Sequence, residues 1–229
     1  MTGTAHAPAG GVPVLGRTRP EIAARVAADL RDGDYVNVGL GIPLLVPEYV
    51  DPGCQVVFHS ENGLLGMGSA PPPDQRDPDL TEAGKGFTTA VPGAAVFDSA
   101  VSFALIRSGR LTATVLGALQ VSATGDLANW HVPGGRPGVG GAMDLVQGAQ
   151  TVWIAMEHTD RAGRPKLVGS CEYELTGRGV VDRVYTDLAV LDVGPGGLVL
   201  RELAPGVSVQ QVRDRTAAPV AVPDGWEEH

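Results

Sequence analysis

The stretch HSENGLLGMG, residues 59–68, places one carboxylate, Glu61, between an apolar run and a series of glycines. The apolar run, residues 56–58, completes a predicted strand that begins at Gln55. A strand that ends in a carboxylate and a glycine-rich turn presents that side chain at the carboxyl edge of an α/β sheet, where such sheets bind ligands. A carboxylate held there can serve as a general base, a metal ligand or a nucleophile.

Helical and strand patterns alternate on both sides of this stretch. Residues 18–21 (TRPE) fit a helical capping box, every fourth residue from Ile22 to Leu30 is apolar, and Gly33 ends this helix. Strands are predicted at 35–38, 55–58, 111–116, 151–156, 180–193 and 198–203, helices at 43–49, 99–108 and 208–215, and an amphipathic stretch at 142–147. This alternation predicts an α/β fold with a single open, largely parallel sheet flanked by helices.

One domain is predicted, over residues 17–222. Residues 1–16 are mostly alanine, glycine, proline and threonine and are expected to form a loose N-terminal tail, and residues 223–229 a C-terminal tail. Within the domain, the proline- and glycine-rich segments 69–79 and 134–141 are expected to be irregular loops.

The composition excludes several classes of protein. The chain has 229 residues and a net charge of −9, which argues against a nucleic-acid surface and against binding to anionic membranes. No run of apolar residues is long enough to span a membrane, and the N-terminus lacks the pattern of a secretion signal. The two cysteines, Cys54 and Cys171, fall in no metal or redox spacing and are expected to be free thiols of a cytoplasmic protein.

Other catalytic patterns are missing from the sequence. His59, His131 and His158 lack the spacing of zinc ligands, so no metal site is predicted. No Gly-x-Ser-x-Gly elbow indicates a serine hydrolase, and residues 39–43 lack the third glycine of a dinucleotide fingerprint. The glycine-rich turns at 39–43, 61–68 and 138–142 offer backbone amides for oxyanions, although each is a weak signal alone. Glu61 remains the strongest candidate.

Further short motifs accompany residues 60–68 along the chain. They are NVGLGIP at 37–43, AGK at 83–85, SFALIR at 102–107, GDLANW at 125–130, GGAMDLV at 140–146 and LTG at 175–177. Together they resemble the family I CoA-transferases, in particular the B (beta) subunit of the 3-oxoacid CoA-transferases. The resemblance covers nearly the whole chain after residue 17.

The resemblance implies covalent catalysis at Glu61. Its carboxylate would attack the thioester of an acyl-CoA, giving a mixed anhydride and CoA thiolate, and the thiolate would return to form a glutamyl-CoA thioester. By the same resemblance, the backbone amides of Gly141 and Ala142 would stabilise the oxyanions. Lys85 would contact CoA, and Asn37 and Asn129 would lie near the reacting groups. Coenzyme A is then a substrate and covalent intermediate, and no permanently bound cofactor is expected.

The sequence departs from the family pattern in three places. An asparagine is expected where Glu82 stands and an acidic residue where Gly86 stands, and residues 100–101 replace a more acidic pair. These departures leave Glu61 untouched. They bear on acyl specificity and on the contacts with CoA.

The resemblance also implies a partner and a substrate class. Some family members hold two homologous halves in one chain, and this chain corresponds to the second half, so a separate A subunit is predicted, in a heterotetramer with two copies of each chain. Succinyl-CoA is the predicted donor, and acetoacetate and 3-oxoadipate are both candidate acceptors. The second carboxylate of 3-oxoadipate has local candidate partners in Arg76, Arg107 and Arg136. An acyl-CoA hydrolase using the same glutamyl thioester, and a non-catalytic binding module, remain alternatives.

Overall fold

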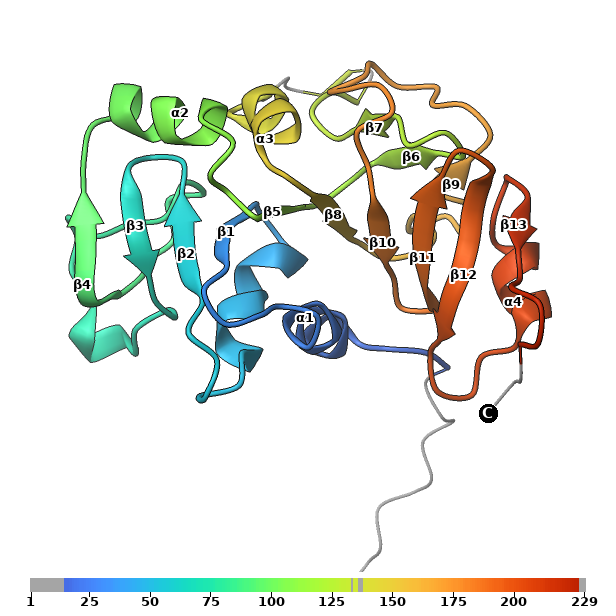
Figure 1. Ribbon diagram of the computed structural model, residues 1–229, viewed down its shortest axis with the longest axis horizontal. Coiled ribbons are helices and arrows are strands. Elements are labelled where there is room, and N and C mark those ends of the chain that lie inside the picture. Colours follow the sequence, from blue (N-terminus) through green and yellow to red (C-terminus); the bar gives the residue numbers. More distant parts are fainter. Residues whose placement is uncertain (1–14, 133, 136–137, 227–229) are drawn as a thin grey trace, which may run out of the picture.

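The computed structural model describes residues 15–132, 134–135 and 138–226 and is built around one ten-stranded sheet (Figure 1). Most of the predicted tails, at 1–14 and 227–229, and the candidate Arg136 lie outside the described residues. In spatial order the strands are β13 (Val220–Ala221), β12 (Gly197–Leu203), β11 (Ala189–Gly194), β10 (Arg183–Tyr185), β8 (Val152–Ala155), β5 (Ala113–Leu116), β1 (Tyr35–Val38), β2 (Val57–Ser60), β3 (Leu64–Met67) and β4 (Ala90–Val96).

The centre of this sheet is parallel. Strands β2, β1, β5, β8 and β10 run in one direction, and β3, β4, β11 and β12 extend the sheet through antiparallel pairs. The predicted open, largely parallel α/β sheet is therefore confirmed. A second sheet of three strands, β7 (Leu127–Ala128), β6 (Gln120–Ser122) and β9 (Leu167–Val168), was not predicted from the sequence.

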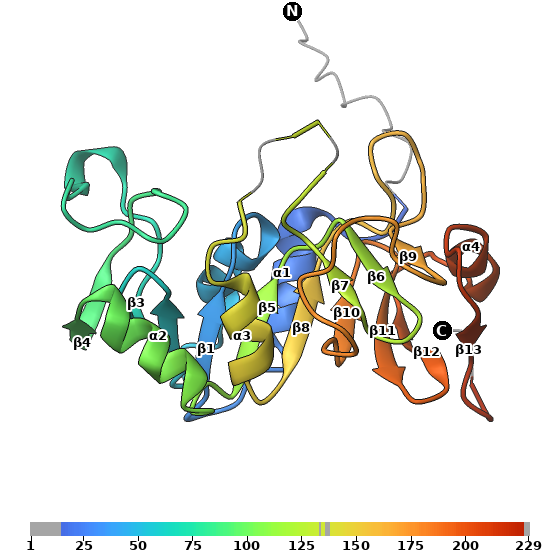
Figure 2. The same cartoon turned by 90° about the horizontal axis from the view of Figure 1, so that it is seen from above.

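Helices cover both faces of the large sheet (Figure 2). Helix α1 (Arg19–Ala27) and the 3₁₀ helix η1 (Ile42–Tyr49) pack on one face, around a core that includes Val26, Val36 and Val115. Helices α2 (Ser99–Arg107) and α3 (Ala142–Gly148) pack on the other face, around a core that includes Ile106 and Leu145. The remaining helices are α4 (Val209–Asp214) and the short 3₁₀ turn η2 (Pro73–Gln75). None of the helices in the described part of the chain has the length and apolar character needed to cross a membrane.

The local signals explain where the helices begin. Thr18 accepts a hydrogen bond from the backbone of Glu21, while the Glu21 carboxylate accepts from the backbone of Thr18, so the predicted capping box is confirmed. Ser208 and Gln211 form the same arrangement at α4. The segment after β1 differs from prediction, since it is a 3₁₀ helix. Pro47 lies inside it, and in an α-helix the ring of this proline would clash with the carbonyl four residues earlier.

The predicted strand at 180–193 is also divided. It forms β10 and β11, which pair antiparallel as a hairpin. Cys54 and Cys171 are both free and partly buried, as predicted.

Candidate active site

Glu61 follows β2 directly and begins the turn that leads back into β3. The sequence pattern did not predict this hairpin. Gly63 closes the turn by donating its N–H to the Ser60 carbonyl at 3.0 Å. It adopts a φ of 115°, and a Cβ at this position would lie 2.0 Å from the Phe97 carbonyl oxygen. Glycine is therefore required beside Glu61 for both backbone conformation and space.

The Glu61 carboxylate is half-buried and bound to one backbone amide. Gly141 N–H lies 3.1 Å from Oε1 and 3.2 Å from Oε2. Burial raises the pKa of the Glu61 carboxyl above its usual value, and the negative charge of Asp144 raises it further, while the hydrogen bond from Gly141 opposes both effects. A carboxylate with reduced solvation and one fixed donor is suited to nucleophilic attack or proton transfer.

A cavity of about 510 Å³ opens in front of this carboxylate at the carboxyl edge of the sheet. Its walls come from the segments that follow β1, β2 and β5, from loop residue Ala83, and from the segment 138–142. Strand β1 lies between β2 and β5, and a change of strand order at such a point leaves a crevice where α/β sheets bind ligands.

Two more of the predicted site residues line this cavity, and their polar groups are already paired. The N–H of Ala142 donates to the Val139 carbonyl at 3.1 Å, so it is not directed at the Glu61 carboxylate. Asn129 donates from Nδ2 to the Gly117 carbonyl at 3.2 Å and accepts from the Thr176 hydroxyl at 2.6 Å. Asn129 thus fixes one wall of the cavity.

Lys85 and Asn37 are not among the residues that line the cavity. Lys85 is exposed, and its φ of 69° is the one positive value among the described non-glycine residues. Asn37 is 1% exposed on β1, and its amide is bonded to His59, beneath Glu61.

The loop that carries Lys85 is anchored beside Glu61. Ser60 Oγ accepts from the Ala83 N–H at 2.9 Å, and Asn62 Nδ2 donates to the Thr81 carbonyl at 2.7 Å. The buried carboxylate of Glu82 accepts from the N–H groups of Gly84 and Gly86, on either side of Lys85. The departure at Glu82 therefore has a structural role, which the sequence did not indicate.

The candidate arginines are engaged at the surface. Arg107 Nε lies 2.7 Å from Asp144 Oδ1, and its guanidinium lies 5.7 Å from the centre of the Phe103 ring. Arg76 stacks on Phe87 at 5.2 Å. In the described part of the chain, no group of three or more His, Cys, Asp and Glu side chains has an arrangement that could hold a metal ion.

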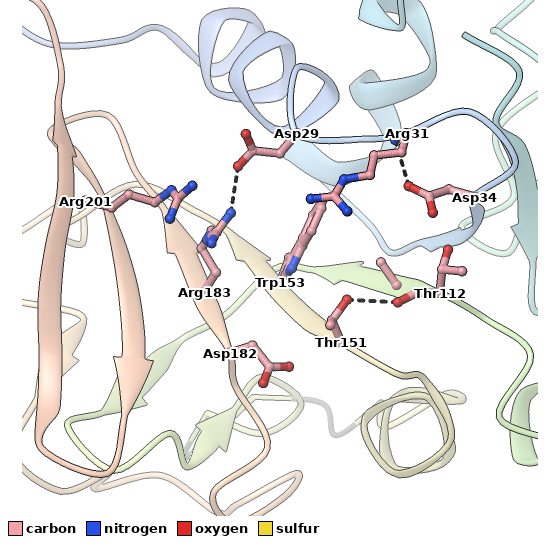
Figure 3. A pocket seen from close by; sticks show the side chains of 10 residues that line it. Asp29, Arg31, Asp34, Thr112, Thr151, Trp153, Asp182, Arg183 and Arg201 are labelled. Carbon is pink, nitrogen blue, oxygen red and sulfur yellow. Dashed lines mark hydrogen bonds and ion pairs between the residues drawn. The ribbon is translucent and has the colours of Figure 1, made fainter.

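A second cavity, of about 380 Å³, lies at the opposite edge of the sheet, near the starts of β1, β5, β8 and β10 (Figure 3). Its walls mix arginines and aspartates, and Arg183 pairs with Asp29 at 2.8 Å. Because Asp29 also pairs with Arg25 of α1, these charges tie the helix to the sheet. The Glu61 cavity, which holds a half-buried carboxylate bound to a backbone amide, is the better candidate for the active site.

Two buried histidines give the fold a predicted sensitivity to acid. Burial lowers the pKa of both His59 and His158 to about 4, and the charges of Arg215 and Lys166 add to this effect at His158. An unfolded histidine titrates near 6.5, so the unfolded chain takes up protons first as the pH falls. The free energy of unfolding therefore includes the full contribution of the two neutral histidines above about pH 6.5. This contribution is lost as the pH falls toward 4.

At pH 5, each neutral buried histidine is expected to lower the free energy of unfolding by about 2 kcal/mol relative to pH 7. Urea unfolding of the wild type and of His158→Gln at both pH values measures this contribution. The variant should lose less stability between pH 7 and pH 5 than the wild type does. Equal losses would contradict the assignment of His158 as a neutral buried group.

Comparisons with known proteins identify the family to which this chain belongs. Residues 19–215 match the family model described as Coenzyme A transferase. The chain belongs to the coenzyme A transferase family. It is 48% identical over 205 residues to the B subunit of the 3-oxoadipate CoA-transferase of Pseudomonas putida, covering 89% of this chain and 96% of the relative. It is also 48% identical over 201 residues to the B subunit of the succinyl-CoA:3-ketoacid coenzyme A transferase of Helicobacter pylori, covering 87% and 97%.

The fold is shared with more distant solved structures. The acyl-CoA transferase YdiF of Escherichia coli O157:H7 matches with a TM-score of 0.71 at 21% identity, over 93% of this chain and 43% of that chain. The present chain therefore spans less than half the length of the E. coli transferase. At this identity the likeness shows the fold alone.

Proposed function

We propose that this chain is the subunit of a 3-oxoacid CoA-transferase that carries the nucleophile, Glu61, and that it moves CoA from succinyl-CoA to a 3-oxoacid. The observation that carries the proposal is the half-buried Glu61 carboxylate, held by the Gly141 amide in a cavity at the carboxyl edge of the sheet. Family membership supplies the reaction type, and the two bacterial relatives are named for transfer of CoA to acids of this class.

In the proposed chemistry, the side-chain carboxylate of Glu61 first forms an anhydride with the acyl group and then a thioester with CoA. A carboxylate oxygen attacks the acyl-CoA thioester carbonyl, the C–S bond breaks, and a mixed anhydride and CoA thiolate are formed. The thiolate attacks the glutamyl carbonyl of the anhydride, which gives a glutamyl-CoA thioester and releases the donor acid as a carboxylate. The acceptor carboxylate then repeats these steps in reverse order and leaves as acyl-CoA.

The site supports these steps in two ways. The Gly141 N–H, which now binds the carboxylate, is a preorganised donor for the oxyanion that forms when the glutamyl carbonyl is attacked, and one such donor is worth about 3 kcal/mol. The N–H of Ala142 can join it only if its bond to Val139 is given up. Partial burial of Glu61 also limits access of water, which would hydrolyse the anhydride and the thioester.

Both acetoacetate and 3-oxoadipate remain candidate acceptors. One relative is named for 3-oxoadipate and the other for 3-ketoacids, a class that includes both acids. Arg107 would have to leave Asp144 to bind a second carboxylate, whereas the stacking of Arg76 on Phe87 does not occupy the in-plane N–H groups of its guanidinium. Comparison of the two acids as acceptors in one assay decides between them.

A separate A subunit is part of this proposal. Both bacterial relatives are named as B subunits, and the matched E. coli transferase is more than twice as long as the matched region. Lys85 would then contact CoA at the mouth of a site completed by the A subunit, in a heterotetramer with two copies of each chain. The free thiols agree with a cytoplasmic location.

The test is to trap the intermediate on the complex of this chain with its A-type partner. The complex is incubated with succinyl-CoA alone, treated with borohydride and digested, and the peptide that contains Glu61 is examined by mass spectrometry. A CoA adduct or its reduction product on Glu61 supports the transferase mechanism. An unmodified Glu61 in a folded complex overturns it, and free CoA formed without an acceptor acid identifies a hydrolase.

The Glu82 carboxylate gives a second prediction. Glu82→Ala leaves the amides of Gly84 and Gly86 without their acceptor and frees the loop that presents Lys85. The KM for acyl-CoA is expected to rise about tenfold, because that loop would have to be ordered again upon binding, while kcat changes less. Steady-state kinetics measure both constants, with Glu48→Ala, at an exposed position, as the matched control. An unchanged KM would remove Lys85 and its loop from CoA binding.

A further inference from the structure

A continuous line of hydrogen bonds runs beneath Glu61 from the middle of the sheet to α2. Ser102 Oγ donates to the Glu61 backbone carbonyl at 2.8 Å and lies 3.0 Å from His59 Nε2. His59 Nδ1 lies 3.2 Å from Asn37 Nδ2, which also lies 3.2 Å from the His59 carbonyl oxygen. Thr114 Oγ1 donates to Asn37 Oδ1 at 3.3 Å. The four side chains of Thr114, Asn37, His59 and Ser102 are here called the relay.

The relay has one self-consistent arrangement of protons. The Glu61 carbonyl can only accept, so Ser102 donates its hydroxyl proton and must accept from Nε2–H of His59. The neutral imidazole then presents a lone pair on Nδ1, which accepts one N–H of Asn37. The second N–H of Asn37 is donated to the His59 carbonyl, and its oxygen accepts from Thr114. Each donor of the relay meets an acceptor.

The relay is buried and carries no charge. All four side chains are at most 1% exposed, and the His59 ring stacks on Phe97 with 6.4 Å between ring centres. Burial lowers the pKa of His59 to about 4, so the ring is neutral at physiological pH. A protonated ring would direct an Nδ1–H at the N–H of Asn37 and break the arrangement.

We propose that the relay is a positioning device for the reaction, which holds the backbone of Glu61 so that its carboxylate remains aimed at the Gly141 amide and the cavity. This inference rests on the proposed role of Glu61 as nucleophile. His59 and Ser102 are positioning residues, because Ser102 bonds the Glu61 backbone carbonyl, His59 bonds Ser102, and the carboxylate itself is bonded to Gly141. Asn37 fixes the tautomer of His59 that allows Ser102 to donate.

The relay fits this role because it ties the turn that carries Glu61 to a helix. Glu61 is the first residue after β2. Its backbone carbonyl accepts a hydrogen bond from Ser102, which lies in α2. A displacement of about 1 Å of a reacting group costs roughly a hundredfold in rate. Loss of the Ser102 hydrogen bond would allow a displacement of this kind at Glu61 while the cavity remains intact.

The experiment uses the complex with the A-type subunit and compares His59→Leu, His59→Gln, Ser102→Ala and the double variant of His59→Leu with Ser102→Ala. Glutamine can supply a donor toward Ser102 and an acceptor toward Asn37, so it is the conservative replacement. His158→Gln is the matched control, since His158 is as buried as His59 and is bonded to Thr186 and Thr216, outside the Glu61 cavity. Formation of the Glu61–CoA thioester is followed in a single turnover at saturating succinyl-CoA, together with kcat, KM and the melting temperature.

His59→Leu and Ser102→Ala are each expected to slow thioester formation and kcat by about ten- to a hundredfold with little change in KM. Their effects should not add in the double variant, and His59→Gln should recover most of the rate. His158→Gln should lower the melting temperature without slowing the folded enzyme.

Two results would overturn the inference while the proposed function stands. One is a wild-type rate of thioester formation in His59→Leu and Ser102→Ala. The other is that His158→Gln slows thioester formation as much as His59→Leu does, with the same melting temperature as that variant. The slowing would then follow from a general loss of stability. If the wild type itself forms no thioester on Glu61, the proposed function fails and the relay loses its role in it.

Discussion

Replacement of Glu61 by glutamine is expected to abolish CoA transfer, with a loss of at least about four orders of magnitude in kcat. The amide has nearly the shape of the carboxylate and can still accept from the Gly141 N–H, so the cavity and the fold should be preserved. An amide oxygen is a much weaker nucleophile than a carboxylate oxygen, and it cannot form the anhydride. The loss should therefore appear in the chemical step, whereas binding of acyl-CoA should change little.

The measurement is a transfer assay with the purified complex, with succinyl-CoA as donor and each 3-oxoacid as acceptor. Glu48→Gln is the matched control, because it removes the same charge at an exposed position of η1. It should retain wild-type activity. Residual activity of Glu61→Gln above a few per cent would assign the nucleophile to another group, provided that mass spectrometry excludes reversion of the glutamine to glutamate.

The central strands were predictable because their residues are buried on both faces. The runs at 35–38, 111–116 and 151–156 are mostly apolar, which is typical of parallel strands covered by helices, and they contain β1, β5 and β8. The predicted strand at 198–203 also formed, as β12, but β3, β4 and β13 were not predicted. Strand β4 at Ala90–Val96 is largely exposed, contains Pro92 and Gly93, and shows neither alternation nor a turn signal at its ends.

The candidate site was predictable only in part, because its contacts join distant segments. Glu61 was identified from its own short motif, but its partner Gly141 is 80 residues away and was connected with it only through the family resemblance. The spacing of His59 argued against a metal ligand, and nothing in the sequence connected this residue with Ser102 in α2. Glu82 likewise stood out only as a departure from the family pattern, whereas the structure gives its carboxylate two amide partners.

The approach of Gly141 to Glu61 leads to the second large prediction, for Gly141→Ala. The backbone of Gly141 has φ −88° and ψ 6°, which an alanine can adopt. A Cβ there would lie 2.5 Å from Glu61 Oε2, 3.1 Å from its Cδ and 3.2 Å from Cζ of Phe103. The methyl group cannot fit beside the carboxylate, so Glu61 must move away from the amide that binds it. A displacement of a reacting group by about 1 Å predicts a loss of roughly a hundredfold in kcat.

Gly196→Ala is the control for this substitution, since a Cβ at Gly196 would meet no atom within 4 Å and its φ is not positive. It should leave transfer and thioester formation unchanged. For Gly141→Ala, the rate of Glu61–CoA formation in a single turnover should fall together with kcat, because the same displaced carboxylate takes part in both half-reactions. Wild-type thioester formation in this variant would mean that the reactive Glu61 carboxylate lies elsewhere than against Gly141, and the assignment of that amide as the oxyanion donor would then be wrong.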